Sequence, residues 1–279
     1  MTRISIVALI KKFLLYIAVI LIVVYSLFPF YWMIVSSLKT KQELFARTPT
    51  LIPVDITFEN FINLFTKTSA AIWLLNSIVT AFVSIFVSVF LASLAAYALT
   101  RFRFRGRRLI TNSILFVYMF PPIMVAIPLF FLICKINMLD TRIGLVLTYS
   151  AKVMPYTIWL LIAFFQTIPV EIEESAYVDG ATKIQTLRRV VLPLALPGII
   201  STSLFGLMVC WNEYVFALTF LSSETKKTIP VGLRMFMTSH GVLWEYIFAL
   251  SIVATIPVLL YFIRQQKKLL ETMAGGVKA

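Results

Sequence analysis

Three long stretches without a charged residue constrain the fold of this chain more than any other feature. They cover residues 13–38, 68–100 and 109–134, and they contain 26, 33 and 26 residues. About 20 apolar residues are enough for a helix to cross the roughly 30 Å hydrocarbon core of a bilayer. Of the 279 residues, 60% are hydrophobic and only 13% are charged, which is far from the usage of soluble globular proteins. The chain is therefore predicted to be an integral membrane protein.

Three more apolar stretches follow, at 143–170, 190–223 and 235–263, each with one or two ionisable residues. Together the six stretches predict an all-α, polytopic membrane protein with a single transmembrane domain over residues 1–279. The predicted helices lie near residues 13–36, 73–99, 109–132, 144–166, 194–221 and 243–263.

The distribution of Lys and Arg predicts the orientation. Fifteen of these residues fall on the side that includes both termini and the 168–193 loop, and nine fall on the other side. The side richer in Lys and Arg is cytoplasmic by the positive-inside rule, so both termini and the 168–193 loop are expected in the cytosol. The net charge of +13 is divided among short loops, which suits anionic lipids and argues against nucleic-acid binding.

The 168–193 segment is too polar for a membrane span and has helix signals of its own. Pro169 suits the start of a helix, and Glu171 places negative charge at its positive end. Gly180 can end that helix with a positive φ angle. Thr182 and Gln185 have the spacing of a capping box, which predicts a second helix. The segment is therefore predicted to be a helix, a glycine hinge and a second helix.

The same segment carries a family pattern. Its motif reads Glu174-Ser175-Ala176, two residues, Asp179-Gly180-Ala181, eight residues and Val190-x-Leu192-Pro193. This motif resembles the EAA loop of the membrane subunits of ATP-binding-cassette (ABC) importers, which reads E-A-A, D-G-A and I-x-L-P at the same offsets. Ser175 and Val190 depart from that pattern, but both preserve side-chain size.

This resemblance implies the fold of a type I ABC importer permease, in which the loop docks on a cytosolic ATPase subunit. The implied ATPase-coupling residues are Glu171, Glu174, Ser175, Ala176, Asp179, Gly180, Ala181, Leu192 and Pro193. The alternative is a surface helical hairpin without a partner.

A second resemblance concerns the substrate. The segments WNEYVFALTFLSS at 211–223 and TIPVGLRMF at 228–236 are similar to the membrane subunits of carbohydrate importers of the maltose and oligosaccharide group. The resemblance implies a permease subunit of an ATP-driven sugar uptake system in the cell membrane. Its implied partners are a cytosolic ATPase dimer, a second and homologous permease subunit, and an extracytoplasmic solute-binding protein.

Polar groups and prolines inside the predicted spans are candidates for the translocation path. Lys152 and Glu213 need a cavity, a partner or a route to the interface, and Pro121 and Pro122 free backbone carbonyls that protein or water must cover. The candidate path or gate residues are Tyr118, Pro121, Pro122, Lys152, Trp211, Asn212 and Glu213. Three alternatives remain open: ordinary kinked packing of the proline-rich helix, a helix that begins near Pro155 and leaves Lys152 at the outer interface, and a purely structural pairing of Glu213 with Lys152.

Other functions have weaker support in the sequence. Neither GxxxxGK[ST] nor GxGxxG occurs, so ATP hydrolysis is expected in a separate subunit and the chain is not expected to be an enzyme. No metal or cofactor is expected, because Cys134 and Cys210 lie in apolar spans without nearby His or Cys. An importer of a non-sugar solute remains an alternative. A stand-alone secondary transporter is a weaker one, because it would depend on Lys152 and Glu213 alone.

Overall fold

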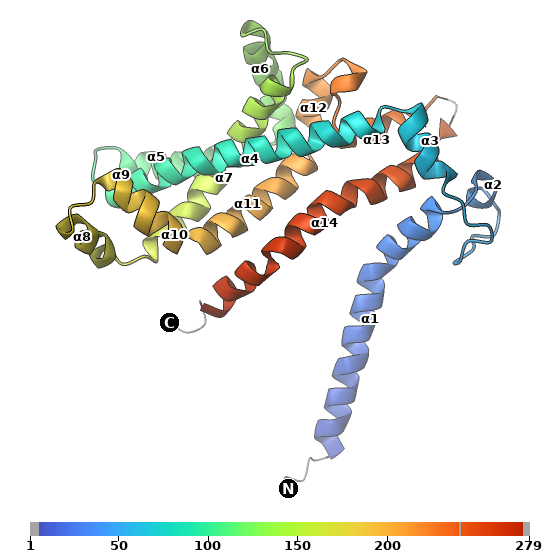
Figure 1. Ribbon diagram of the computed structural model, residues 1–279, viewed down its shortest axis with the longest axis horizontal. Coiled ribbons are helices and arrows are strands. Elements are labelled where there is room, and N and C mark those ends of the chain that lie inside the picture. Colours follow the sequence, from blue (N-terminus) through green and yellow to red (C-terminus); the bar gives the residue numbers. More distant parts are fainter. Residues whose placement is uncertain (1–5, 240, 276–279) are drawn as a thin grey trace. The chain divides into compact units, whose positions relative to one another are not determined.

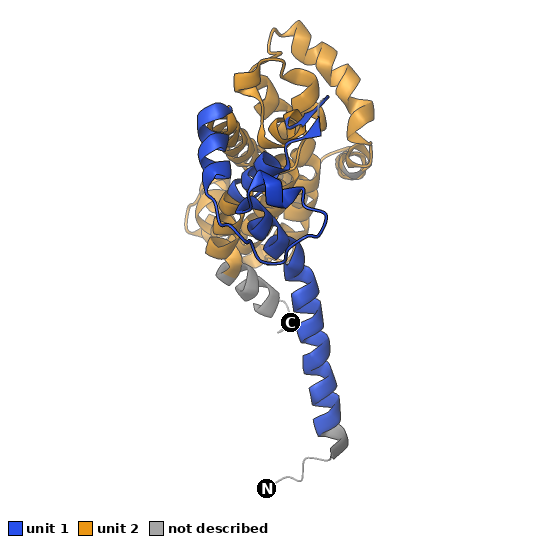
Figure 2. Cartoon of the chain, turned by 90° about the vertical axis from the view of Figure 1, so that its right-hand side faces the viewer, with its two compact units in different colours: residues 1–68, 236–253 blue, residues 69–235, 254–279 orange. Residues whose placement is uncertain are grey.

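A computed structural model describes residues 6–239 and 241–275, which are almost entirely helical (Figure 1). The chain divides into two compact units, one formed by residues 1–68 and 236–253 and the other by residues 69–235 and 254–279 (Figure 2). The two chain ends, which the sequence predicts to be cytoplasmic, lie outside the described residues. The expectation of one permease domain over residues 1–279 stays a prediction.

The first unit is built on α1 (Ile6–Ser37), which has no charged residue after Lys12. The most apolar window of α1 buries no residue inside this chain, as expected for a helix that lies in lipid or against another protein. The end of α1 is tied to α3 (Glu59–Lys67), because the Asn60 side-chain amide donates to the carbonyls of Ser37 and Lys39, both at 2.8 Å. The unit also contains α2 (Lys41–Leu44), the hairpin of β1 (Met237–Thr238) and β2 (Gly241–Val242), and the start of α14 (Trp244–Gly275).

The second unit is organised around α4 (Ala70–Arg101) and α7 (Arg142–Gln166), with α11 (Leu196–Trp211) packed against both. Small residues line the contact between α4 and α7, and their hydroxyls bond across it. Ser88 Oγ donates to the Ser150 carbonyl at 3.0 Å, and Ser150 Oγ donates to the Ser84 carbonyl at 3.2 Å. In a membrane, where apolar burial does not drive helices together, such close packing and hydrogen bonding hold the helices to one another.

The second unit also contains shorter elements. They are α5 (Arg107–Tyr118), α6 (Pro122–Lys135), α8 (Val170–Val178), α9 (Lys183–Thr186), the π-helix η1 (Leu187–Val191), α10 (Leu192–Leu194), α12 (Val215–Phe220), the 3₁₀ turn η2 (Glu224–Lys226) and α13 (Ile229–Met235). Elements α8 and α9 lie at the end of the bundle where α4 terminates, and α13 lies at the end where α4 begins (Figure 1).

Among the described residues, four helices are long and apolar enough to cross a membrane: α1, α4, α7 and α14. The number rises to six if each of two bent helix pairs forms one span. One pair is α5 with α6, which are bent by 104°, and the other joins residues 183–194 to α11 with a bend of 75°.

Two predicted helices are therefore wrong as single helices. The helix predicted at 109–132 breaks at Pro121 and Pro122, which lack amide donors and cannot continue a hydrogen-bond ladder. The helix predicted at 194–221 ends at Trp211, and α12 begins only at Val215.

The end of the bundle opposite α8 is held by two tight contacts. Trp73 donates from Nε1 to the Glu224 carbonyl at 2.9 Å, and a Cβ on Gly232 would lie only 2.2 Å from the Trp73 ring. In the turn between α6 and α7, Asp140 accepts from the amides of Ser222 and Ser223, both at 3.0 Å.

Asp140 also accepts from Lys226 Nζ at 2.9 Å. Partial burial opposes ionisation of this carboxyl. The hydrogen bonds from Ser223, Lys226 and Ser222 outweigh burial and lower the pKa of Asp140 well below its usual range.

Candidate functional site

The 168–193 segment folds as the sequence predicts. Pro169 precedes α8, and Glu171 lies in its first turn. Gly180 follows α8 with a φ of +83°, the left-handed conformation that glycine adopts without strain. At the start of α9, the Thr182 amide donates to Gln185 Oε1 at 2.8 Å, and the Gln185 amide donates to Thr182 Oγ1 at 3.4 Å. Both hydrogen bonds of the predicted capping box are therefore confirmed.

Most residues predicted to couple to an ATPase lie on the outside of this segment. Glu171, Glu174, Ser175, Asp179, Gly180 and Pro193 are exposed, and Ala176, Ala181 and Leu192 are partly buried. Two large apolar side chains of the same segment are exposed as well: Val178 is 88% exposed and Ile184 is 78% exposed. Exposed apolar side chains beside acidic residues are typical of a surface that interacts with another protein or with a membrane.

One acidic residue of α8 behaves differently and was not among the predicted site residues. Glu173 is buried, and its Oε1 accepts from Arg101 Nε at 2.5 Å. Its Oε2 accepts from the Tyr97 hydroxyl at 3.0 Å. The sequence held one signal for this contact, since Glu173 and Tyr177 are four residues apart on one helix, as are Tyr97 and Arg101 on another.

A cavity of about 500 Å³ lies between α5, α6, α7 and α12. Four of the seven predicted path residues line it: Tyr118, Pro121, Pro122 and Lys152. The rest of the lining is almost entirely apolar, and the ring of Phe216 lies 5.4 Å from Lys152 Nζ. The break between α5 and α6 therefore opens onto a cavity, where its freed carbonyls can be covered.

Lys152 and Glu213 form an ion pair beside this cavity, with 3.2 Å between Lys152 Nζ and Glu213 Oε1. Glu213 Oε2 accepts from the amides of Phe216 and Ala217 at 3.0 and 3.3 Å and so caps the start of α12. Because α7 begins at Arg142, Lys152 lies about 15 Å along that helix. The alternative of a helix that begins near Pro155 is therefore wrong.

The last two predicted path residues do not line the cavity. Trp211 is buried at the end of α11. Asn212 is exposed, and its side-chain amide donates to the Met208 carbonyl at 2.9 Å. Within the described ranges, no three His, Cys, Asp or Glu side chains lie close enough to hold a metal ion. The roles of the path residues and of the coupling residues stay predictions.

Solved structures share this fold. A bacterial ABC transporter involved in the import of the acidic polysaccharide alginate has a chain that superposes with a TM-score of 0.83 at 24% identity, covering 96% of this chain and 99% of that one. The MetNI methionine ABC transporter has a chain with a TM-score of 0.59 at 15% identity, covering 76% and 98%. The architecture is thus that of ABC importer membrane subunits.

Curated relatives match along almost the whole length. The Inner membrane ABC transporter permease protein YcjP of Escherichia coli (strain K12) is 37% identical over 261 residues, which are 92% of this chain and 93% of the relative. The Trehalose/maltose transport system permease protein MalG of Thermococcus litoralis is 35% identical over 274 residues, covering 95% and 96%. The Diacetylchitobiose uptake system permease protein DasC of Streptomyces coelicolor is 34% identical over 252 residues, covering 90% and 91%.

A family model described as "Binding-protein-dependent transport system inner membrane component" matches residues 85–269. Together with the apolar helices, this match supports a location in a membrane. The chain therefore belongs to the family of binding-protein-dependent transport system inner membrane components, and it is a transport component rather than an enzyme.

Proposed function

We propose that this chain is one permease subunit of an ATP-driven sugar importer, forming half of the translocation path. The observation that carries the proposal is the exposed surface of α8 and α9, where Glu174, Val178 and Ile184 are free to meet another protein. The substrate class rests on relatives whose names refer to trehalose and maltose, to diacetylchitobiose and to sulfoquinovosyl glycerol.

The 168–193 segment would dock on a cytosolic ATPase subunit. Ser175 and Ala176 are small enough to let the backbone of α8 approach a partner, and Glu174 is available to an Arg or Lys of that partner. Gly180 provides the hinge between the two helices, and Leu192 and Pro193 begin the helix that leads back into the bundle.

The arrangement of the complete importer follows from this role. Six spans, counting each bent helix pair as one, are few for enclosing a solute, so a second, homologous permease subunit would complete the path. Two ATPase subunits would lie on the cytosolic side and a solute-binding protein on the outer side of the cell membrane. Sugar would pass along the cavity lined by Tyr118, Pro121, Pro122 and Lys152, with Trp211, Asn212 and Glu213 near its outer gate.

A stand-alone secondary transporter has less support. Such a transporter needs ionisable groups that exchange partners during the cycle. Lys152 and Glu213 instead neutralise one another, and Glu213 is further held by two backbone amides. An ABC importer of a non-sugar solute remains the main alternative.

The test is to express the chain with its partner permease, ATPase and solute-binding protein and to purify the complex. ATP hydrolysis is then measured in proteoliposomes across a panel of sugars, with amino acids as the comparison panel. The proposal expects co-purification of the ATPase and stimulation by one or more sugars. Stimulation only by an amino acid would refute sugar as the substrate class and favour an importer of a non-sugar solute. Absence of the ATPase from the complex would refute the importer role.

The proposed orientation has its own test. Single cysteines at Gln185 and at Thr238, in a background without Cys134 and Cys210, are exposed to a membrane-impermeant thiol reagent in intact cells. We expect labelling only at position 238, because the 168–193 segment is proposed to face the cytosol. Labelling at 185 from outside would overturn both the orientation and the coupling role.

A further inference from the structure

A polar cluster with a buried centre joins α8 to the end of α4. It consists of Tyr97, Arg101, Glu173 and Tyr177, and its side chains come from two residues four apart on each helix. The Glu173 side chain is only 2% exposed and that of Arg101 only 10%. A carboxylate this well buried is stable only if charge and hydrogen bonds compensate it, so the cluster fixes the position of α8 against α4.

The direction of each hydrogen bond follows from the number of protons available. Glu173 accepts on both oxygens, from Arg101 Nε at 2.5 Å and from the Tyr97 hydroxyl at 3.0 Å. Tyr97 has a single hydroxyl proton, which this bond uses, so at their 3.1 Å contact the Tyr177 hydroxyl donates to the Tyr97 oxygen. The Tyr177 hydroxyl thus donates to Tyr97, and the Tyr97 hydroxyl donates to Glu173. Glu173 also accepts from Arg101.

Arg101 extends the cluster to a third helix. Its Nη2 donates to the carbonyls of Phe165 and Ile168, at 3.0 and 2.9 Å. Phe165 lies in the last turn of α7, where helix carbonyls lack intrahelical partners, and Ile168 lies just after the end of that helix. One guanidinium therefore binds α4, α7 and α8 together, which the planar fork of Arg can do and the single ammonium of Lys cannot.

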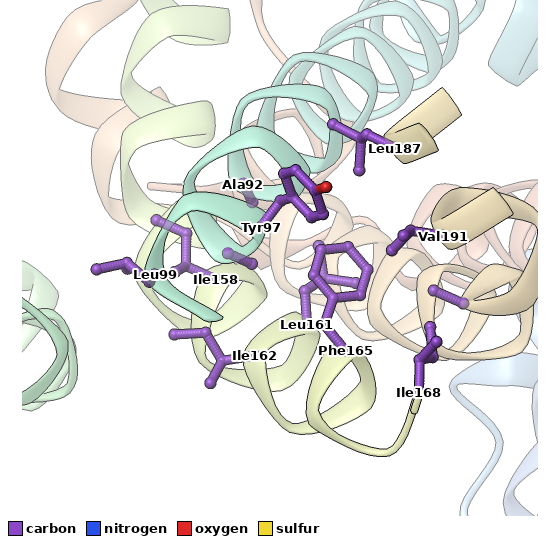
Figure 3. Packing of buried hydrophobic residues seen from close by; sticks show 12 residues of the cluster. Ala92, Tyr97, Leu99, Ile158, Leu161, Ile162, Phe165, Ile168, Leu187 and Val191 are labelled. Carbon is purple, nitrogen blue, oxygen red and sulfur yellow. The ribbon is translucent and has the colours of Figure 1, made fainter. Parts of the chain in front are cut away.

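The second half of the 168–193 segment is held to the same helices by apolar packing. Leu187 and Val191 of η1 lie in one buried cluster with Tyr97 of α4 and Phe165 of α7 (Figure 3). In addition, Lys183 Nζ lies 4.6 Å from the ring of Phe102, directly after α4. This packing holds η1 against α4 and α7.

The far end of α4 holds a different segment. Asn76 donates from its amide to the carbonyls of Thr225 and Lys227, at 2.9 and 2.8 Å, and Ser77 Oγ accepts from the Ile229 amide at 2.8 Å. The 32 residues of α4 span about 48 Å at 1.5 Å per residue. One continuous helix therefore connects the 168–193 segment to residues 224–232 at the opposite end of the bundle.

We propose that Arg101 and Glu173 are positioning residues that couple movement of α8 to α4, and that α4 carries this movement to the 224–232 segment. The proposal rests on the proposed importer function, in which α8 moves with the ATPase. The movement of α8 would then reach α4 through this buried ion pair, and not only through the backbone that joins the 168–193 segment to α7 and α11.

The test uses the assembled importer in proteoliposomes and measures solute uptake per ATP hydrolysed. Glu173→Gln keeps the shape of the side chain and removes its charge, and Arg101→Lys keeps the charge and removes the fork. For both variants we expect normal assembly, retained ATP hydrolysis and a several-fold fall in uptake per ATP. The matched control is Arg105→Gln, since Arg105 is exposed in the adjacent loop.

A second measurement tests whether the ion pair transmits movement to the 224–232 segment or only stabilises the fold. A single cysteine at exposed position Thr225, in the background without Cys134 and Cys210, should change its labelling rate when ATP is added to the otherwise wild-type complex. In Glu173→Gln this ATP-dependent change should disappear. An assembled Glu173→Gln complex with wild-type uptake per ATP and an unchanged labelling response would overturn the proposal.

If Glu173→Gln does not assemble, the Arg101→Lys complex decides, because this variant perturbs the same ion pair from the α4 side. Unchanged uptake per ATP in an assembled Arg101→Lys complex then counts against the proposal, and a fall supports it. Absence of ATP-driven uptake in the wild-type complex would instead count against the importer function itself.

Discussion

Replacing Lys152 with Met should destabilise the protein more than replacing its partner Glu213 with Gln. The two side chains form one ion pair, but their surroundings differ. The Glu213 side chain is 2% exposed, whereas that of Lys152 is 23% exposed and borders the cavity of about 500 Å³. Removing Lys152 leaves a buried carboxylate, while removing the charge of Glu213 leaves an ammonium that water in the cavity can reach.

The expected magnitudes follow from the contacts. Removing one partner of a buried ion pair costs about 3–5 kcal/mol. Two backbone amides still bind the Glu213 carboxylate after Lys152 is removed, which puts Lys152→Met near the lower end, at about 3 kcal/mol. In Glu213→Gln the new amide oxygen can still accept from those backbone amides, so about 1.5 kcal/mol is expected, a typical value for losing one hydrogen bond to a charged group.

The assay is thermal unfolding of the purified protein in lipid nanodiscs. At about 2 °C per kcal/mol for a chain of this size, Tm should fall by about 6 °C in Lys152→Met and by about 3 °C in Glu213→Gln. The double variant should lose less than the sum of the two, because residues in contact are coupled. Lys135→Met serves as the control, since Lys135 is exposed at the end of α6. Equal shifts in the two single variants, or strictly additive shifts in the double variant, would refute the reasoning.

Three other predictions concern the rest of the bundle. Gly180→Val should reduce uptake per ATP, because a non-glycine residue in the left-handed conformation costs roughly 1–2 kcal/mol. Gly180→Asn should retain uptake, because Asn adopts this conformation more readily. Normal uptake by a Gly180→Val complex that is expressed at the wild-type level would contradict the hinge role. Gly232→Ala should lower Tm by the equivalent of about 1–3 kcal/mol, because its Cβ would overlap the buried Trp73 ring, and an unchanged Tm would show that α13 can shift. Asp140 should stabilise the protein fully above its unfolded pKa of about 3.9 and progressively less as the pH falls below that value, because its folded pKa is lowered. The Tm difference between wild type and Asp140→Asn should therefore shrink between pH 5 and pH 3, and a difference that does not change with pH would exclude this linkage.

The sequence by itself determined the features that depend on neighbouring residues. The charge-free stretches predicted apolar helices, and α1, α4, α7 and α14 lie where those stretches are. The helix, glycine hinge and helix at 168–193 followed from Gly180 and from the capping box of Thr182 and Gln185, because caps and positive φ angles are set within a few residues.

The sequence did not predict the geometry where the chain breaks or turns inside a span. Pro121 and Pro122 showed that the helix at 109–132 would be disturbed, but not that α5 and α6 would be bent by 104°. A proline removes hydrogen bonds and leaves the direction of the following helix to its packing partners, here α7 for α5 and α12 for α6.

Only the tertiary structure decided which charged residues meet. Glu173 and Arg101 are 72 residues apart in sequence, and Lys152 and Glu213 are 61 apart. In sequence, Glu171, Glu173 and Glu174 look alike, because all three are carboxylates near the start of the same short helix. The fold buries Glu173 beside Arg101 and leaves the other two exposed, because burial depends on how α8 is placed against the ends of α4 and α7.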